Sequence, residues 1–340
     1  MNTSARTRAT GRVTLHDVAA VAHVSPITAS RALRGLPTVS GELVARVQAA
    51  AAKLGYVPDP AARALASSHS TQVVVLVPTL SGKVFVDLLE AAHRTLWPAG
   101  FQPLIGVTHH DPAEEERLLH SYLLQRPAGL ILTGLERSAA LRERLAASGA
   151  PCVHAMELSR EAGVPSVGCS HEDAGHALTQ HLLERGRKRI AFVAGELDAR
   201  VRQRAEGYRR ALHEAGLYDA RREVFDARQV SLALGAELFA QLHERQRATD
   251  AIVFSSDALA QGALLAALRL HIRVPQQIAI AGFDDLDGDE QMLPSLTSVR
   301  TPGADIGTQA ARLLLALMRG EAIERPTIDV GFELVVRGSS

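Results

Sequence analysis

The sequence predicts an α/β protein that opens with a small all-α domain. Two short helices with strong cap signals lie within the first sixty residues, and from residue 72 onward short aliphatic runs alternate with helical stretches. Aromatic residues make up only 4% of the chain, so the cores must be aliphatic. A chain of 340 residues has room for two or three domains of ordinary size.

Charge is distributed unevenly along the chain. Residues 1–70 carry eight Lys/Arg and three Asp/Glu, a net charge of +5, and the remaining residues carry 29 and 34, a net charge of −5. A small basic module on an acidic body is typical of proteins that bind nucleic acid through one domain.

Two features favour a cytoplasmic protein. Cys152 and Cys169 do not form a C-x-x-C pair, and two cysteines cannot provide a disulfide framework for a chain of this length. This favours buried free thiols in a reducing compartment. The N-terminal residues are polar and basic, and no run of 18 apolar residues occurs. We therefore expect neither a signal peptide nor a membrane span.

The first two predicted helices are joined by a short turn. Thr14 caps the first, with Asp17 three residues later as an acidic variant of the capping box. Ser25 followed by Pro26 caps the second, which runs to about Leu33. This arrangement predicts a helix-turn-helix, whose second helix enters the major groove of DNA.

A third helix is predicted from the cap Ser40 to about Leu54, and residues 67–71 have the composition of a linker. These signals divide the chain into a basic arm, a helix-turn-helix domain, a hinge with linker, and a large α/β domain, over residues 1–13, 14–57, 58–71 and 72–340.

The order T-L-x-D-V-A-x-x-A-x-V-S-x-x-T-x-S-R-x-L, from Thr14 to Leu33, resembles the DNA-binding headpiece of the LacI family of repressors. The match continues through residues 39–66. His23 stands where the family usually has glycine, and a left-handed backbone there would cost some stability. The resemblance implies a homodimer that reads a palindromic operator.

The resemblance also implies which residues contact DNA. Arg31 can donate two hydrogen bonds to guanine, while Pro26 and Ile27 offer apolar contact that suits a thymine methyl. The hydroxyls of Thr28 and Ser30 reach bases or phosphates, or merely pack. The remaining DNA-binding positions are Thr14, Ser25, Arg34, Tyr56, Arg63, Ala64 and Leu65.

In the large domain, mostly uninterrupted apolar runs predict strands that are buried on both faces, as in a parallel sheet. These runs are Val73–Val77, Pro103–Val107, Gly129–Leu132, Cys152–Ala155, Arg189–Ala194, Ala251–Phe254 and Ile278–Phe283. The helices predicted between them are Asp87–Trp97, Ala113–Leu124, Ala174–Arg185, Arg204–Ala215, Leu234–Glu244 and Ala258–Arg269. Two doubly wound subdomains follow, with a ligand site expected in the cleft between them.

Phrases such as Gly186–Ala191, Ser256–Gly262 and Ile280–Asp285 resemble the effector domain of the same family. The resemblance implies a two-lobed, periplasmic-binding-protein-like domain in which Arg204 and Asp284 are the main effector contacts. The other implied contacts are Val84, Phe85, Asp173, Val230 and Ser256. The alternatives are a surface arginine for Arg204 and a cap after a strand for Asp284.

The amino-acid sequence of residues 25–35 is similar to the corresponding segment of gluconate and ketogluconate regulators within the family. This implies a sugar-acid effector, toward which Arg200, Arg202 and Arg204 could offer positive charge, although arginines two apart do not share a helix face. A repressor released by an inducer is favoured, and a corepressor would use the same parts. No leucine heptad follows Ile328–Val336, so nothing supports a tetramer formed by a C-terminal coiled coil.

Two other classes of protein, a secreted sugar-binding protein and an enzyme, match the sequence less well. A secreted sugar-binding protein of the same fold would lack the headpiece, and an enzyme would need a motif such as G-x-G-x-x-G, G-x-x-x-x-G-K-[ST] or G-x-S-x-G, all of which are absent. His109-His110-Asp111 is interpreted as a solvated loop and not as a metal cluster. The acidic run Asp284–Asp287 is assigned by the resemblance to ligand recognition. No cofactor and no metal are expected.

Two prolines precede the alanine-rich segment 60–66, which is too short to be a stable helix alone. By resemblance it folds on DNA and inserts Leu65 into the minor groove; the alternative is a plain linker residue. Leu65→Ala should weaken operator affinity and leave effector binding unchanged, because it removes only the wedge. Titration of labelled operator measures this, and unchanged operator affinity would refute the wedge.

Overall fold

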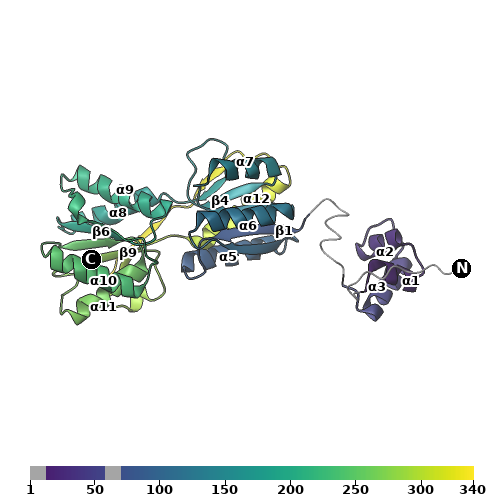
Figure 1. Cartoon of the computed structure of the whole chain (residues 1–340), viewed down its shortest axis with the longest axis horizontal. Coiled ribbons are helices and arrows are strands. Elements are labelled where there is room, and N and C mark those ends of the chain that lie inside the picture. The colour runs from purple at the N-terminus through teal and green to yellow at the C-terminus, as the bar shows by residue number, and fades with distance from the viewer. Residues whose placement is uncertain (1–12, 58–69) are drawn as a thin grey trace. The chain divides into compact units, whose positions relative to one another are not determined.

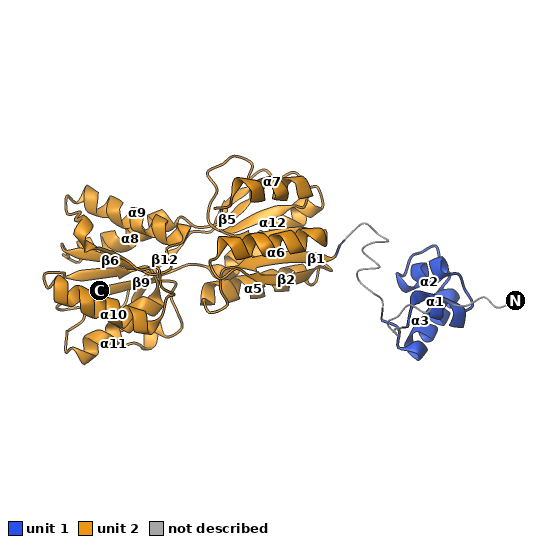
Figure 2. Cartoon of the chain, in the orientation of Figure 1, with its two compact units in different colours: residues 1–70 blue, residues 71–340 orange. Residues whose placement is uncertain are grey.

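Residues 13–57 and 70–340 are described by a computed structural model of the chain (Figure 1). The chain divides into two compact units, residues 1–70 and 71–340 (Figure 2). The predicted hinge positions Arg63, Ala64 and Leu65 lie outside the described residues. Each unit is therefore considered by itself.

Within residues 13–57, the described part of the first unit contains three short helices, α1 (Leu15–Val21), α2 (Pro26–Leu33) and α3 (Gly41–Leu54). They begin and end within a residue of the predicted positions, because caps are strong local signals. Their common core consists of small side chains and includes Val18, Ala29 and Val47, none of which is exposed to solvent. Tyr56 packs against this core after α3 ends at the left-handed Gly55.

The second unit has two lobes, each a twisted six-stranded sheet covered by helices (Figure 1). The sheet of lobe A has the order β11-β5-β4-β3-β1-β2 and is parallel throughout. Its strands are β1 (Gln72–Val77), β2 (Gln102–Val107), β3 (Gly129–Thr133), β4 (Cys152–Met156), β5 (Ser166–Gly168) and β11 (Thr327–Asp329). Its helices are α5 (Lys83–Leu96), α6 (Pro112–Leu124), α7 (Ala139–Ser148) and α12 (Gly303–Met318).

The sheet of lobe B has the order β12-β10-β9-β8-β6-β7 and is parallel except where β12 pairs with β10. Its strands are β6 (Ile190–Ala194), β7 (Glu223–Phe225), β8 (Ala251–Phe254), β9 (Ala279–Phe283), β10 (Thr297–Arg300) and β12 (Glu333–Val335). Its helices are α8 (His171–Glu184), α9 (Ala199–Glu214), α10 (Leu232–Arg245) and α11 (Asp257–Arg269), with short 3₁₀ turns at Ala220–Arg222 and Asp289–Gln291.

The chain passes between the lobes three times, after β5, after β10 and after β11. The yellow C-terminal ribbon in Figure 1 accordingly occurs in both lobes. The sequence predicted two consecutive lobes and did not predict this return, because β5, β11 and β12 have only three residues each. The sequence pattern also did not predict the apolar helix α12, which packs on α5, or the helix α7 between β3 and β4.

Two helices that bear predicted site residues start earlier than expected. Helix α5 begins at Lys83 and not at Asp87, so Val84 and Phe85 lie in its first turn. Helix α9 begins at Ala199 and not at Arg204, because the side chain of Asp198 caps it by accepting from the N–H of Val201 at 2.9 Å. Val84 and Phe85 in α5, and Arg204 in α9, are therefore held in place by a helix.

Close contact between α8 and α9 fixes the backbone of Arg204. A Cβ atom on Gly175 would lie 2.3 Å from the carbonyl oxygen of Arg204, and one on Gly207 would lie 1.9 Å from that of Glu172. Only glycine permits this approach, because any larger side chain would force the helices apart.

Two carboxyl groups are buried together beneath the loop that follows β9. Asp257 accepts from Ser298 Oγ at 2.7 Å, and the N–H of Leu286 donates to Asp289 at 2.7 Å and to Asp257 at 3.3 Å. Burial, and then the charge of Asp289, raise the pKa of Asp257 well above its ordinary value. Asp257 therefore retains its proton in the folded protein, and the pair holds the loop that carries Asp284.

This pair makes stability depend on pH. Above about pH 4 Asp257 ionises in the unfolded chain but not in the folded one, so the free energy of unfolding should fall with rising pH by up to about 1.4 kcal/mol per unit. Asp257→Asn removes this titration and should flatten the profile between pH 5 and pH 8 in urea unfolding. Asp287→Asn, at an 88% exposed side chain of the same loop, is the control. An unchanged slope in Asp257→Asn would contradict the protonated pair.

Candidate functional site

The turn between α1 and α2 is fixed by hydrogen bonds at both helix starts. Thr14 donates its backbone N–H and its hydroxyl to Asp17 at 2.7 and 2.8 Å, and Ser25 Oγ accepts from the N–H of Thr28 at 3.1 Å. His23 lies between them in a left-handed conformation, with φ of +52°. The turn therefore has the conformation for which the family's glycine is suited, and histidine adopts it at some cost.

Helix α2 buries one face and exposes the other. Ala29 and Ala32 pack into the core, while Ile27, Arg31 and Arg34 follow each other at i, i+4 and i+7 on the solvent side. The side chain of Ile27 is 66% exposed, which is unusual for a large aliphatic residue in a unit this small. This face has one apolar and two cationic groups, the combination that reads bases and phosphates.

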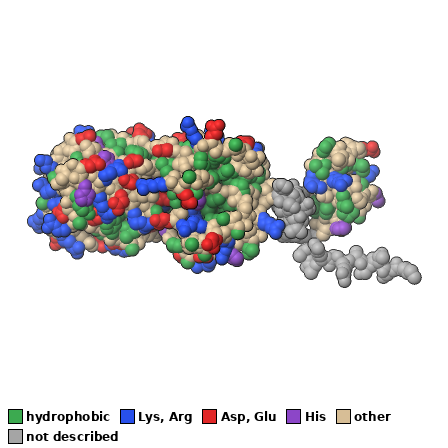
Figure 3. All heavy atoms as spheres, turned by 90° about the horizontal axis from the view of Figure 1, so that it is seen from above, with side chains coloured by type: hydrophobic (Ala, Val, Ile, Leu, Met, Phe, Trp, Pro, Cys, Tyr) green, Lys and Arg blue, Asp and Glu red, His purple; other side chains and the backbone are tan. Residues whose placement is uncertain are grey.

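The other predicted DNA-binding positions surround this face. Thr14, Ser25 and Arg34 are exposed, whereas Pro26, Thr28, Ser30 and Tyr56 are half-buried. Thr28 pairs with Ser25, and Arg34 Nε donates to the carbonyl of Ser30 at 3.3 Å. Figure 3 shows Lys and Arg mixed with Asp and Glu over the visible face of the second unit.

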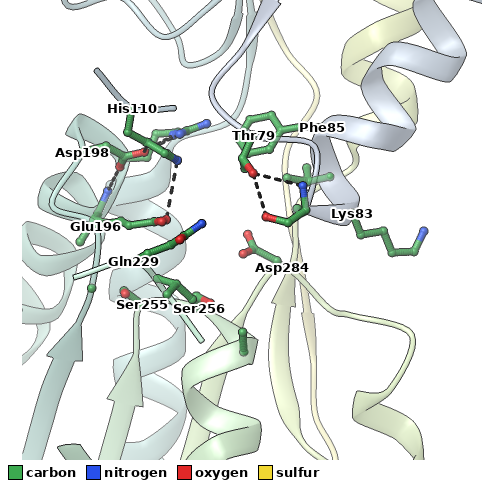
Figure 4. Close-up of a pocket in the computed structure, with 18 of the residues that line it drawn as sticks. Thr79, Lys83, Phe85, His110, Glu196, Asp198, Gln229, Ser255, Ser256 and Asp284 are labelled. Atoms are coloured by element: carbon green, nitrogen blue, oxygen red, sulfur yellow. Dashed lines mark hydrogen bonds and ion pairs between the residues drawn. The ribbon is translucent and has the colours of Figure 1, made fainter. Parts of the chain in front are cut away.

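A cavity of about 280 Å³ lies between the two lobes of the second unit (Figure 4). Lobe A contributes the loop from Thr79 to Phe85 with His110 and Met156, and lobe B contributes the loops after β6, β7, β8 and β9. These loops all follow the carboxyl ends of parallel strands, where α/β proteins bind small ligands.

Arg204 is the most enclosed cation of the cavity, with only 7% of its side chain exposed. Nη2 donates to Asp284 at 3.3 Å, Nη1 donates to the carbonyl of Ser255, and the guanidinium lies 4.0 Å above the centre of the Phe283 ring. A buried guanidinium held on three sides keeps a fixed orientation, so it can bind a carboxylate or a pair of hydroxyls without reordering.

Arg200 lies one helical turn before Arg204 and also lines the cavity. Its guanidinium pairs with Asp198 and lies 4.9 Å from the centre of the Phe85 ring. Burial alone would raise the pKa of Asp198, but Arg200 and the N–H of Val201 hold it well below its usual value. Arg202 instead donates to the carbonyl of Leu197 and to Glu136, so the i, i+4 pair faces the cavity and the middle arginine does not.

A chain of hydrogen bonds connects this site to lobe A. Arg204 Nε donates to His171 Nδ1 at 3.3 Å, and His171 Nε2 is 3.0 Å from the carbonyl oxygen of Met156. Burial, and then the charge of Arg204, place the pKa of His171 well below its ordinary value. The neutral ring therefore carries its proton on Nε2 and donates it to Met156, the last residue of β4.

Backbone strain is concentrated around the cavity. His110, Met156, Glu196 and Asp284 all line it, and all are non-glycine residues with φ between +47° and +106°. Such conformations cost about 1 to 3 kcal/mol each and persist only where the surroundings impose them. The strain indicates that these loops are shaped for a ligand.

The structure brings six of the seven predicted effector residues to this cavity: Val84, Phe85, Arg204, Val230, Ser256 and Asp284. Asp173 is not among its lining residues. It lies in the first turn of α8, where its exposed carboxylate pairs with Arg210 at 2.7 Å. The sequence position was ambiguous because the first turn of a helix favours an acidic residue with or without a ligand.

Sequence reasoning missed several polar residues of the cavity. The loop 109–111 was predicted to be solvated, yet only 23% of the His110 side chain is exposed and it lines the cavity, while His109 points outward. The other missed side chains include Thr79, Lys83, Glu196, Asp198 and Gln229, whereas Arg200 was named from the sequence as a source of positive charge. The adjacent cap Asp111 was a signal that this loop is ordered.

Three other features concern the described residues only. Cys152 and Cys169 are free, and burial raises the pKa of their thiols to about 12 and about 11. Within residues 13–57 and 70–340, no cluster of His, Cys, Asp and Glu is arranged to hold a metal ion. No helix in the same ranges has the length and apolarity needed to cross a membrane.

Comparison with known proteins identifies both parts of the chain. Residues 14–59 match the model of bacterial regulatory proteins of the lacI family, and residues 179–340 match the periplasmic binding protein-like domain. The HTH-type transcriptional regulator GntR of Pseudomonas aeruginosa is 50% identical over 334 residues, which cover 98% of this chain and 97% of that protein.

Solved structures agree with these matches. The lac repressor dimer bound to operator and an anti-inducer has a TM-score of 0.83 and 25% identity, over 96% of this chain and 99% of that one. A complex of the transcriptional regulator CelR with cellobiose has a TM-score of 0.70 and 30% identity, over 97% of this chain and 100% of that one. With a helix-turn-helix followed by a two-lobed periplasmic-binding-protein-like domain, the chain belongs to the LacI family of bacterial regulatory proteins and is a transcriptional regulator.

Proposed function

We propose that this regulator is a repressor that binds a palindromic operator as a homodimer and releases it when a sugar acid, such as gluconate or ketogluconate, occupies the cavity between its lobes. The observation that carries the proposal is the fixed guanidinium of Arg204, buried at the base of a cavity lined by polar side chains. The cavity is small enough to enclose a single sugar-sized molecule.

Two arginines facing the same cavity support an anionic ligand. Arg200 and Arg204 point to it from successive turns of α9, and Lys83 also lines it. The carboxylates Glu196, Asp198 and Asp284 can accept hydrogen bonds from ligand hydroxyls. This mixture of cations and acceptors suits a molecule with one carboxylate and several hydroxyl groups.

The pairing of these charges supports binding and not catalysis. Arg204 is paired with Asp284 and Arg200 with Asp198, so both guanidinium groups are held in fixed orientations. A nucleophile would need an adjacent base to activate it, and Ser255 and Ser256 have no hydrogen bond to a histidine among the described residues. We therefore assign no enzymatic activity to the cavity.

The exposed face of α2 supports direct base readout. Ile27 and Arg31 would contact bases, and Thr14, Ser25 and Arg34 would contact phosphates. The predicted hinge residues Arg63, Ala64 and Leu65 would enter the minor groove, as the family resemblance implies. Operator and effector then oppose each other through linkage, because each of these two ligands favours a different arrangement of the same chain.

An apolar groove on lobe B supports the homodimer. Leu268 at the end of α11 is 66% exposed and Leu293 is 86% exposed, and both border the groove. Two large aliphatic side chains this exposed are costly in water, and a second copy of the chain would cover them. The similar lac repressor structure is a dimer on its operator.

Arg204→Ala tests the proposal. Removing the guanidinium leaves Asp284 unpaired and takes away the fixed cation, so the affinity for the effector should fall at least about thirtyfold. Operator affinity should remain, because the headpiece is untouched. The measurement is fluorescence anisotropy of an operator duplex selected by the wild-type protein, titrated with gluconate and ketogluconate.

Asp173→Asn is the matched control, because Asp173 is not among the residues that line the cavity and its exposed carboxylate pairs with Arg210. It should respond to the effector as the wild type does. If Arg204→Ala releases the operator at wild-type effector concentrations, the cavity is not the effector site.

A further inference from the structure

Two loops meet across the cavity from opposite lobes, and each presents one polar side chain to the other. His110 comes from lobe A, between β2 and α6, and Glu196 comes from lobe B, between β6 and α9. Nε2 of His110 lies 3.6 Å from an oxygen of Glu196, and Nδ1 lies 3.7 Å from an oxygen of Asp198. Figure 4 shows these three side chains together, opposite Thr79, Phe85 and Asp284.

The imidazole of His110 is left without a hydrogen bond. Its Nε2 atom is buried and has no partner within hydrogen-bonding distance among the described residues. A distance of 3.6 Å to a carboxylate is too long for a direct hydrogen bond. Buried polar atoms are nearly always paired in folded proteins, so an unpaired one at a cavity wall indicates that its partner is a bound molecule.

The backbone holds His110 in this position. His109 and His110 have φ values of +49° and +57°, and the N–H of Asp111 donates to the carbonyl of Thr108 at 2.8 Å, which closes a tight turn. The turn sends His109 outward and His110 into the cavity. Glu196 is also left-handed, with φ of +47°. Strain on both sides of the gap indicates that the pair is fixed before a ligand arrives.

Burial lowers the pKa of His110, which outweighs the opposing effect of Glu196 and Asp198, while Arg200 and His109 lower it further. The ring is therefore neutral in this arrangement, with one nitrogen as donor and the other as acceptor. A neutral imidazole does not form an ion pair with Glu196. The pair instead offers one donor and one acceptor 3.6 Å apart.

We propose that His110 and Glu196 together hold one hydroxyl group of the effector, and that this contact selects a polyhydroxylated ligand. By distance, an oxygen about 2.8 Å from each atom would form the apex of a triangle on the 3.6 Å base. The hydroxyl accepts from Nε2 of His110 and donates to the carboxylate of Glu196. Because the two partners belong to different lobes, the same hydroxyl joins the lobes. The inference rests on the proposed effector site.

The experiment uses the full chain with D-gluconate as the probe, in isothermal titration calorimetry at pH 7.5. His110→Phe keeps the ring and removes both nitrogens, and Glu196→Gln removes the charge at nearly constant size. Each should weaken gluconate binding about tenfold to a hundredfold, since His110→Phe removes the donor and Glu196→Gln replaces the charged acceptor by a weaker neutral one. His109→Phe changes the exposed neighbour in the same strained turn and should bind gluconate within twofold of the wild type.

Monodeoxy gluconates identify the hydroxyl. One of them should lose affinity for the wild type by about the factor that His110→Phe costs, and should bind the wild type and His110→Phe equally. Thermal unfolding checks that each variant is folded; if His110→Phe does not fold, Glu196→Gln with the same deoxy series gives the same test.

Gluconate binding to a folded His110→Phe or Glu196→Gln at wild-type affinity would overturn this inference and leave the proposed function intact. The inference would also be overturned if every monodeoxy gluconate lost the same factor of affinity, relative to gluconate, in the wild type and in His110→Phe. Failure of gluconate to bind the wild type would overturn both the inference and the proposed effector.

Discussion

The second unit depends on one buried cation, the guanidinium of Arg204. It joins Asp284 and the carbonyl of Ser255 on lobe B to His171, which reaches the carbonyl of Met156 on lobe A. A charge this deeply buried is tolerated only when its hydrogen bonds are nearly all made. The arrangement of the loops around it is therefore tightly constrained, and a continuous chain of hydrogen bonds joins the two lobes.

The path of the chain between the lobes indicates where the second unit can flex. Three crossings join them, after β5, β10 and β11, and each crossing is only a few residues long. The sheets on either side are packed with aliphatic side chains and do not deform easily. Any relative movement of the lobes would therefore be accommodated at the crossings and in the loops that line the cavity, and His171 directly follows one of these crossings.

The polar groups of the cavity are arranged in advance of binding. The loop that carries Asp284 is held by the buried pair Asp257 and Asp289, which both accept from the N–H of Leu286. Arg200 is held by Asp198, which also caps α9. Three residues in the loops that line the cavity, His110, Glu196 and Asp284, have a left-handed backbone. Strain and buried charge both reduce stability, and their concentration at one cavity is the pattern of a preorganised binding site.

The sequence by itself determined the helix-turn-helix and most of the strands, and its resemblance to a known family pointed to six residues of the cavity. Caps such as Thr14, Ser25 and Asp111 and aliphatic runs act within one turn or one strand, so they can be read locally. Only the tertiary structure decided that α12 returns to lobe A, that His110 turns inward, that Arg200 joins Arg204, and that Asp173 pairs with Arg210 instead of facing the cavity. The physical reason is that a cavity between two lobes is formed by loops whose conformation depends on one another, and such long-range dependence leaves no periodic signal in the sequence.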